Sequence, residues 1–421
     1  MRKNYTSLLI GLFLLPFLFV PLVLEAQNAN NFIGFHLKSL RKHSFKYNFK
    51  QYNNLIVIPM EVNGIDTLNF VLDSGVGYTL ITDPNVMEKL NLPCLRKIKV
   101  AGAGEDEELI GCISSVEKIQ FKGIEANNHS LIILEEDILQ LSRYAGIKIH
   151  GLIGYDILSR FVVEINFLNQ TLIFTDPMYY KQKLGKKEEL FTLSIEEMKP
   201  YVQAEAILKN STSTPLKLIL DTGAGHSLSL DTGTHPDIRV PDRFVTSQIG
   251  VTLNGAVKGA IARIEKFRLG SFEMEKVITA FPDSTSLRFM RGINQRQGNL
   301  GCGVLKRFHI TFNYPHEKLI LKPNRHFKTP FEFNTSGIEL VASGSEYDEF
   351  EIGSVRKGSP AFEADLRRGD KIIAIDGEMI HNMDMNQIYK LINKKGGERT
   401  DLFMKRYNTF FIVSLLLQEP I

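Results

Sequence analysis

Two short stretches of the sequence place a carboxylate, a hydroxyl and a glycine in a row at the end of an apolar run. They read FVLDSG at residues 70–75 and LILDTG at residues 218–223. Either triplet alone is weak evidence, because Asp, Ser, Thr and Gly are also common turn residues. Two Asp carboxyls held face to face, however, cannot both ionise without cost and would share one proton. The ionised Asp could then take a proton from water while its protonated partner donates to a carbonyl oxygen, which is the chemistry of hydrolysis.

The two triplets belong to an internal repeat. Residues 151–174 (GLIGYDILSRFVVEINFLNQTLIF) align with residues 298–321 (GNLGCGVLKRFHITFNYPHEKLIL) at a shift of 298 − 151 = 147. The two triplet carboxylates, Asp73 and Asp221, differ by 221 − 73 = 148. Two independent landmarks thus agree to one residue, which indicates a duplicated unit. The aligned segments share these identical pairs: Gly151 and Gly298, Gly154 and Gly301, Leu158 and Leu305, Arg160 and Arg307, Phe161 and Phe308, Asn166 and Asn313.

Each copy of the repeat has the pattern of a mainly β unit. An alternating strand and a turn precede the apolar strand that ends at the Asp, and short strands with glycine-rich turns and a short helix follow. The first repeat covers residues 45–177 and the second covers residues 195–324. We expect two similar lobes, at 27–180 and 190–325, joined by the charged linker KQKLGKKEEL. Such a duplication predicts a pseudo-two-fold axis that brings equivalent residues face to face.

The residues beside the two carboxylates suit a shared site. Ser74 and Thr222 supply hydroxyls that can hydrogen-bond across the axis and fix the two loops. Gly75 and Gly223 leave room for backbone N–H groups to approach the carboxylates. The predicted catalytic pair is therefore Asp73 and Asp221, supported by these four residues, and the chemistry needs no metal and no cofactor.

Three other residues near the triplets are given structural roles. Asp231 opens a third Asp-Thr-Gly, but the repeat aligns it with Asp83 of a turn, so we expect a turn residue. His226 aligns with Tyr78 and is predicted to be a strand side chain near the site instead of a catalytic base. Cys302 has no neighbouring His in the sequence, which favours buried packing over a nucleophile.

The paired signals resemble the retropepsin-like aspartic proteases, with two lobes fused in one chain as in pepsin-type enzymes. The resemblance covers residues 45–324 and includes both Asp triplets. It also includes the apolar-Gly signature in both copies, Ile153-Gly154 and Leu300-Gly301. It implies two retropepsin-like β-barrel lobes with a substrate cleft between them. It also implies one or two β-hairpin flaps over the cleft, for which the candidates are residues 100–111 and 250–262.

The residues after the two glycines depart from the pattern of many acid-active members of this family. Those members carry Ser or Thr there, whose hydroxyl can stabilise the ionised carboxylate. Here the positions hold Val76 and Ala224. The missing donors predict activity that reaches weakly acidic to neutral pH.

The last segment, at residues 333–420, resembles a bacterial PDZ domain. Gly358-Ser359-Pro360 leads a short helix, and a strand then closes at Asp376-Gly377. In that fold an extended peptide adds to a strand edge, with its terminal carboxylate held by backbone N–H groups. By position, the resemblance implies that Ser336, Gly337 and Ile338 form the carboxylate loop and that NQIYKLIN forms the flanking helix. The alternative is a purely structural cap on the second lobe.

The N-terminus has the features of an export signal. Arg2 and Lys3 precede an apolar run from residue 8 to residue 23, and the small Ala26 follows. Residues 1–26 are thus either a cleaved signal peptide or an uncleaved membrane anchor, and the chain is expected to be periplasmic or secreted. Its three cysteines form at most one pair, so either Cys94 bonds Cys112 or all three are free thiols.

Composition narrows the function classes. The 421 residues are 43% hydrophobic and 23% charged, with a formal net charge of +3, which describes several globular domains and gives no reason to expect nucleic acid as a partner. The favoured function is an exported aspartic endopeptidase whose PDZ domain recruits or positions a peptide or protein substrate. The main alternative is a non-catalytic envelope protein that binds peptides in the same cleft and groove. We expect a monomer, and self-association of two-lobed chains is a third hypothesis.

Overall fold

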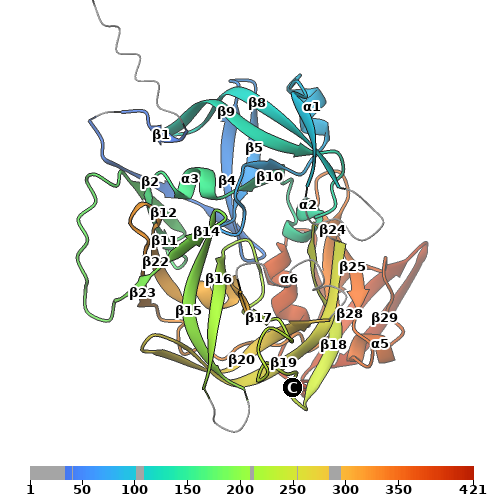
Figure 1. Ribbon diagram of the computed structural model, residues 1–421. Coiled ribbons are helices and arrows are strands. Elements are labelled where there is room, and N and C mark those ends of the chain that lie inside the picture. The colour runs from blue at the N-terminus through green and yellow to red at the C-terminus, as the bar shows by residue number, and fades with distance from the viewer. Residues whose placement is uncertain (1–33, 40, 101–108, 209–212, 254, 284–294) are drawn as a thin grey trace, which may run out of the picture. The chain divides into compact units, whose positions relative to one another are not determined.

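The computed structural model describes residues 34–421 except 40, 101–108, 209–212, 254 and 284–294 (Figure 1). Over these residues the chain is mainly β, as the sequence predicts, and forms four sheets. The expected signal or anchor at residues 1–26 lies outside the described residues. Among the residues that are described, no helix combines the length and the apolar character needed to cross a membrane.

The first sheet is built from the first repeat and carries Asp73 at the end of a buried strand. Its order is β1-β9-β6-β10-β5-β4-β8-β7, with β3 paired to β4. The strand β5 is central and lies parallel to β10, with Leu72 opposite Ile153. The strands of this sheet are β1 (His36–Leu37), β3 (Lys50–Tyr52), β4 (Leu55–Val62), β5 (Asp66–Leu72), β6 (Leu80–Ile81), β7 (Arg96–Lys99), β8 (Ile110–Phe121), β9 (Ile124–Leu134) and β10 (Gly151–Ile153).

The second repeat forms an equivalent sheet in the order β14-β15-β16-β21-β17-β20-β19-β18. The strand β16 ends at Asp221 and lies parallel to β21, with Leu220 opposite Leu300. These two leucines are the repeat partners of Leu72 and Ile153, so the duplicated sequence has folded into a duplicated strand pairing. The strands are β14 (Ser194–Glu196), β15 (Lys199–Ile207), β16 (Ser213–Asp221), β17 (Leu228–Leu230), β18 (Phe244–Thr252), β19 (Gly255–Leu269), β20 (Phe272–Pro282) and β21 (Gly298–Gly301).

A third sheet combines strands of both repeats in the order β13-β23-β22-β11-β12-β2. At its centre β11 and β22 pair antiparallel, with Glu164 opposite Thr311 (Figure 1). These two residues differ by 311 − 164 = 147, the shift of the repeat, so the pseudo-two-fold axis passes between them. The strands are β2 (Ser44–Asn48), β11 (Val162–Asn166), β12 (Thr171–Thr175), β13 (Glu189–Thr192), β22 (Phe308–Asn313) and β23 (Lys318–Pro323).

This third sheet corrects one end of the expected linker at residues 181–190. Glu189 and Leu190 begin β13, where they pair with Leu321 and Ile320 of β23. The pairing gives the strand's backbone groups hydrogen-bond partners along the edge of the sheet. The linker proper is therefore shorter than its charged composition suggests.

Short helices follow the apolar-Gly signature in both repeats. Gly154 directly precedes α3 (Tyr155–Leu158), and Gly301 directly precedes α4 (Cys302–Leu305). A Cβ atom at Gly154 would lie closer than 3.0 Å to the carbonyl oxygens of Asp73 and Val76. The glycine is thus required because the Asp loop passes against it. The other helices of the two repeats are α1 (Asn85–Lys89), α2 (Leu141–Ala145) and the 3-10 helix η1 (Tyr314–His316).

The C-terminal segment has its own sheet and core. The order is β24-β25-β26-β28-β29, with β27 paired to β26. The helix α6 (Met385–Ile392) begins with a capping box of Asp384 and Gln387, and α5 (Pro360–Glu363) is capped by Ser359. Ile338, Ile388 and other buried apolar side chains form a separate core. The strands are β24 (Ile338–Ser343), β25 (Glu349–Val355), β26 (Lys371–Ile375), β27 (Glu378–Met379), β28 (Arg399–Arg406) and β29 (Thr409–Leu416).

The structure decides between a Cys94–Cys112 disulfide and three free thiols. Cys94 is bonded to Cys112, and this disulfide connects the segment before β7 to β8. Cys302 is a free, buried thiol. The chain thus carries one pair and one leftover cysteine.

Candidate active site

The two Asp loops meet through a reciprocal set of four hydrogen bonds. The Ser74 hydroxyl donates to the Leu220 carbonyl oxygen at 2.7 Å, and the Thr222 hydroxyl donates to the Leu72 carbonyl oxygen at 2.8 Å. The backbone N–H of Ser74 donates to the Thr222 hydroxyl, and that of Thr222 donates to the Ser74 hydroxyl, both at 3.0 Å. Both hydroxyl side chains are fully buried. The bonds cross the pseudo-two-fold axis in pairs and lock the loops that carry Asp73 and Asp221.

The carboxyl groups of Asp73 and Asp221 face each other across this lock. Asp73 Oδ1 accepts the N–H of Gly75 at 2.7 Å, and Asp221 Oδ1 accepts the N–H of Gly223 at 3.0 Å. A Cβ atom at Gly223 would lie closer than 3.0 Å to Cγ and both oxygens of the Asp73 carboxyl. The glycine of each loop thus leaves the space that the opposite carboxyl occupies.

The environment of Asp73 favours its protonated form. Burial raises the pKa of Asp73 well above its ordinary value, and the neighbouring Asp221 charge raises it further. The Gly75 N–H and the more distant Lys199 cation act in the opposite direction but do not reverse the shift. Asp73 therefore keeps a proton to a higher pH than an isolated aspartic acid would.

One neighbour of the carboxyl pair, Asn299, was not predicted from the sequence. Asn299 Nδ2, on β21, donates to Asp221 Oδ2 at 2.8 Å. The repeat aligns Asn299 with Leu152, since 299 − 147 = 152, so the two Asp residues do not have equivalent neighbours. The sequence did contain a signal for this contact. A polar residue stands two positions before the signature Gly301, where the other repeat has a leucine.

The residues that follow the two glycines act through their backbone. The Val76 carbonyl oxygen accepts the N–H of Tyr155 at 3.0 Å, and the Ala224 carbonyl oxygen accepts the N–H of Cys302 at 2.8 Å. These bonds tie each Asp loop to the start of α3 or α4. The Val76 side chain packs against an apolar group that we call the Leu152 cluster. This cluster consists of Leu55, Val57, Val71, Leu80, Leu109, Leu134, Ala145, Ile149 and Leu152.

His226 and Cys302 lie close to the pair in unreactive forms. His226 stands in the loop between β16 and β17, not in a strand as expected, and burial lowers the pKa of its imidazole. Burial raises the pKa of the Cys302 thiol, which donates to the Thr222 carbonyl oxygen at 3.2 Å. A neutral imidazole and a protonated thiol fit packing roles.

Asp231 occupies the turn that the repeat alignment predicts. Its carbonyl oxygen accepts the N–H of Thr234 at 3.3 Å directly after β17. Burial raises the pKa of its carboxyl to about 6. Asp231 is therefore a buried Asp with a turn function.

One of the two candidate flaps can be described. Residues 250–252 and 255–262 belong to the antiparallel pair β18 and β19, and Leu253 after β18 packs against the Leu152 cluster of the first repeat. A hairpin of the second repeat thus reaches the apolar wall beside Val76. Most of the other candidate flap, residues 101–108, lies outside the described residues.

The short helix α2 links the second Asp loop to the C-terminal sheet. A Cβ atom at Gly225 would lie closer than 3.0 Å to the Tyr144 hydroxyl oxygen. The adjacent Arg143 forms an ion pair with Glu351 at 2.6 Å and donates through Nε to the Ala342 carbonyl oxygen of β24 at 3.3 Å. The edge strand β24 is therefore already in contact with the first repeat.

The expected carboxylate loop of the C-terminal domain is hydrogen-bonded to side chains of the chain itself. The backbone N–H groups of Ser336 and Gly337 donate to the side chains of Asn393 (3.2 Å) and Asn334 (2.7 Å), respectively. The N–H of Ile338 donates to the Ser336 hydroxyl at 3.2 Å. Asparagine and serine side chains thus accept the hydrogen bonds of these three groups, and the role of the groups in holding a peptide carboxylate stays a prediction.

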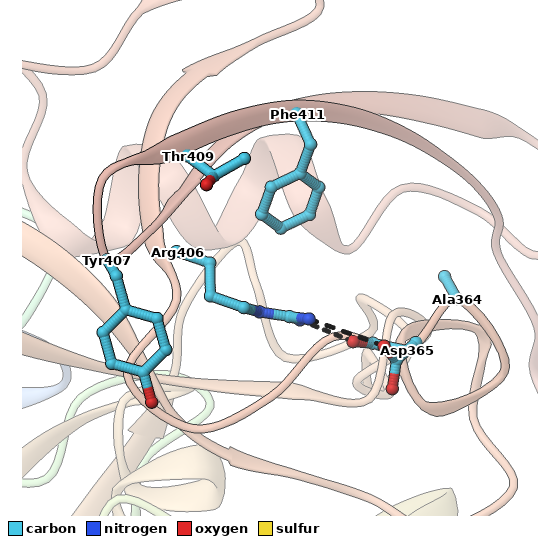
Figure 2. Close-up of a pocket in the computed structure, with 6 residues that line it drawn as sticks. All are labelled: Ala364, Asp365, Arg406, Tyr407, Thr409 and Phe411. Carbon is cyan, nitrogen blue, oxygen red and sulfur yellow. Dashed lines mark hydrogen bonds and ion pairs between the residues drawn. The ribbon is translucent and has the colours of Figure 1, made fainter.

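The pocket shown in Figure 2 belongs to the C-terminal sheet and not to the Asp loops. Arg406 crosses it and is paired with Asp370 at 2.7 Å and with Asp365 at 3.4 Å. Its cation is thus already balanced by carboxylates. The lining residues are Ala364, Asp365, Arg406, Tyr407, Thr409 and Phe411.

Two family models agree with this architecture. A model of the aspartyl protease family matches residues 58–157 and 206–303, and a model of the PDZ domain matches residues 351–406. A solved structure titled photosystem II D1 C-terminal processing protease is 18% identical, with a TM-score of 0.19, over 20% of this chain and 22% of that one. The chain thus spans about a fifth of that structure's length. The chain carries a duplicated aspartyl protease region followed by a C-terminal PDZ domain.

Proposed function

We propose that this chain is an exported aspartic endopeptidase that hydrolyses peptide bonds with Asp73 and Asp221. The observation that carries the proposal is the reciprocal lock of Ser74 and Thr222, which holds two carboxyls face to face. A partly buried pair of like acids is costly to maintain, and such pairs concentrate at functional sites. Between them the two groups can activate a water and polarise a carbonyl.

The proposed reaction needs only the two carboxyls and one water. The water oxygen attacks the peptide carbon while its proton passes to the ionised carboxylate, and the protonated carboxyl gives its proton to the carbonyl oxygen. The tetrahedral diol then breaks its C–N bond as the amine nitrogen takes a proton from the protonated carboxyl and one diol hydroxyl gives its proton to the ionised carboxylate. The products are a carboxylic acid and an amine, and one carboxyl of the pair again holds the shared proton.

A digest of a peptide library by the purified chain, read by mass spectrometry, tests this proposal. We expect cleavage at defined bonds that stops when a peptide with a tetrahedral alcohol in place of the scissile carbonyl is added, because the site should bind that geometry tightly. The alternative is a non-catalytic envelope protein. Peptides that bind but stay intact would favour that alternative.

Export is supported by the N-terminal pattern and by the disulfide. Structural disulfides persist mainly in oxidising compartments outside the cytosol, and Cys94 is bonded to Cys112. Mass spectrometry of the native protein's N-terminus separates a cleaved signal from a retained anchor. A reduced protein with an intact N-terminus, found in the cytosol, would overturn the export proposal.

The missing hydroxyl at position 224 leads to a pH prediction. Ala224→Ser is expected to move the acidic limb of the pH profile of kcat/KM down by about one pH unit, because a hydroxyl can stabilise the ionised pair. The basic limb reflects loss of the proton from Asp73, whose pKa is raised, so activity falls only as the pH rises through that raised value. Wild-type activity should therefore reach weakly acidic to neutral pH.

The matched control is Ala224→Val, which adds bulk without a donor and should leave the acidic limb in place. A wild-type profile that peaks below about pH 3.5 would show that the missing hydroxyls have no influence on the pair.

We also propose that the PDZ domain recruits or positions substrate and that α2 regulates access to it. The edge strand β24 is in contact with α2 through Arg143, which also pairs with Glu351. A peptide that adds to this edge must displace those contacts. Substrate capture by the PDZ domain is thus coupled to release of α2.

Charge reversal of the ion pair tests this coupling. Arg143→Glu and Glu351→Arg should each tighten binding of a C-terminal peptide to the chain by about five-fold, the equivalent of about 1 kcal/mol for a partly exposed pair. The double variant should return part of the way to the wild-type affinity, because the pair forms again in reverse while the Arg143 bond to the Ala342 carbonyl oxygen stays lost. Fluorescence anisotropy with a labelled peptide measures all four proteins, and equal affinities would exclude the coupling.

A further inference from the structure

Asn299 contacts the carboxyl pair from one side only. It lies on β21 between β16 and β17, with Ile219 and Ser229 as its strand neighbours. Its Nδ2 donates to Asp221 Oδ2 at 2.8 Å. Its Oδ1 is buried and, among the described residues, has no hydrogen-bond partner. The orientation of the amide thus gives its Nδ2 a hydrogen bond to Asp221 and leaves its Oδ1 without one among the described residues.

The repeat provides an internal comparison for this contact. The partner of Asn299 is Leu152 on β10, which is 7% exposed and packs with Val71 and Leu80 in the Leu152 cluster. A leucine offers no hydrogen to a carboxylate. The two halves of the site share the reciprocal hydrogen bonds of Ser74 and Thr222 but differ at the position that contacts Asp221 Oδ2.

We propose that Asn299 is a positioning residue that places the negative charge of the pair on Asp221 and the shared proton on Asp73. This inference adds a residue role to the proposed hydrolysis, and the catalytic part of that role rests on the proposed function. An N–H donor stabilises a buried carboxylate more than a buried carboxylic acid, because the bond to the charged form is stronger. The apolar wall at Leu152 gives Asp73 no such preference.

The charged and titratable groups around the pair do not provide a better explanation. Lys199 acts on Asp73 and favours charge there, against the proposed order. Protonated His226 would favour charge on Asp221, but burial lowers the pKa of His226 and keeps it neutral. The Cys302 thiol and the Tyr314 phenol are buried and protonated, since burial raises the pKa of both. Asn299 is thus the contact that breaks the symmetry in the proposed direction.

The assignment gives each carboxyl a separate task. Ionised Asp221 takes the proton of the attacking water, and protonated Asp73 gives its proton to the carbonyl oxygen of the substrate. Asn299 touches neither water nor substrate in this scheme. It acts through Asp221, by holding the base in its charged form.

The test is a titration of the aspartate carboxyl carbons by carbon-13 NMR in the full chain. The wild type should show two titration midpoints for the pair. The lower midpoint should be absent from Asp221→Asn and present in Asp73→Asn. Asn299→Leu, which copies the first repeat, should raise that lower midpoint by about one pH unit, since a hydrogen bond to a charged group is lost. The acidic limb of the pH profile of kcat/KM should shift with it.

Leu152→Asn is the reciprocal variant and should lower the upper midpoint, because Asp73 then gains a donor. If this buried substitution prevents folding, the Asn299→Leu variant still tests the inference. Its fold should be kept, because asparagine and leucine side chains are similar in size. A lower midpoint that belongs to Asp73, or one that Asn299→Leu leaves unchanged, would overturn the inference. The NMR titration needs no turnover, so a chain that cleaves nothing would contradict the proposed hydrolysis without deciding the role of Asn299.

Discussion

Replacing Asp221 by Asn is expected to lower kcat/KM for peptide cleavage by about a thousand-fold or more, and Asp73→Asn should do the same. Each amide keeps the shape of the carboxyl but can neither accept the water proton nor supply a proton to the carbonyl. The two variants should not be additive, because the carboxyls act as one unit. Steady-state kinetics on a peptide found in the library digest, with the single and double variants, measures this.

The thermal midpoint of the Asn variants is the control for folding. The pKa of Asp73 is raised in the folded chain, so the folded state binds more protons than the unfolded state between the unfolded value of about 3.9 and the raised value. Stability from this group is therefore lost as the pH rises through that window. Asp73→Asn removes the effect and should melt no lower than the wild type at pH 7. A large drop in melting temperature would make the loss of activity a folding effect.

Gly223→Ala is expected to reduce kcat/KM by about a hundred-fold or more while the chain still folds. The new methyl would stand closer than 3.0 Å to the Asp73 carboxyl, which is itself held by the N–H of Gly75 at 2.7 Å. The carboxyl must then rotate away from Asp221, and a displacement of this size disrupts a site that depends on fixed geometry. Kinetics and thermal melts of the variant measure both consequences.

Gly185→Ala, in the exposed linker, is the matched control, because a Cβ atom there meets only the end of the Glu188 side chain, at 3.1 Å. It should leave kcat/KM near the wild-type value. If Gly223→Ala were equally harmless, the two carboxyls would not need the close approach described above.

The features that the repeat specifies were predictable from the sequence. The shift of 147 or 148 residues located both Asp loops, the short helices after Gly154 and Gly301, and the turn at Asp231. It also suggested the hydroxyl contacts across the axis, because Ser74 and Thr222 occupy equivalent places. Symmetry thus allowed a long-range arrangement to be inferred from local patterns.

The features that break the repeat were not predictable in the same way. Asn299 looks like an ordinary polar residue in a strand, and its bond to Asp221 depends on how β21 lies beside β16. The contact of Arg143 with β24 joins segments about 200 residues apart, and no local pattern encodes it. The backbone N–H and the hydroxyl of Ser336 donate to asparagine side chains that lie beside it in space. These are tertiary contacts, and they decide which strand edges and donors are accessible.

The most direct test of the central claim compares wild type and Asp221→Asn in parallel library digests from about pH 3 to about pH 8. We expect cleavage at a defined set of bonds by the wild type, extending into the weakly acidic to neutral range, and none of those cleavages by the folded variant. A wild-type chain that binds peptides but leaves every bond intact across that range would contradict the claim, as would a variant that cleaves the same bonds at the same rate.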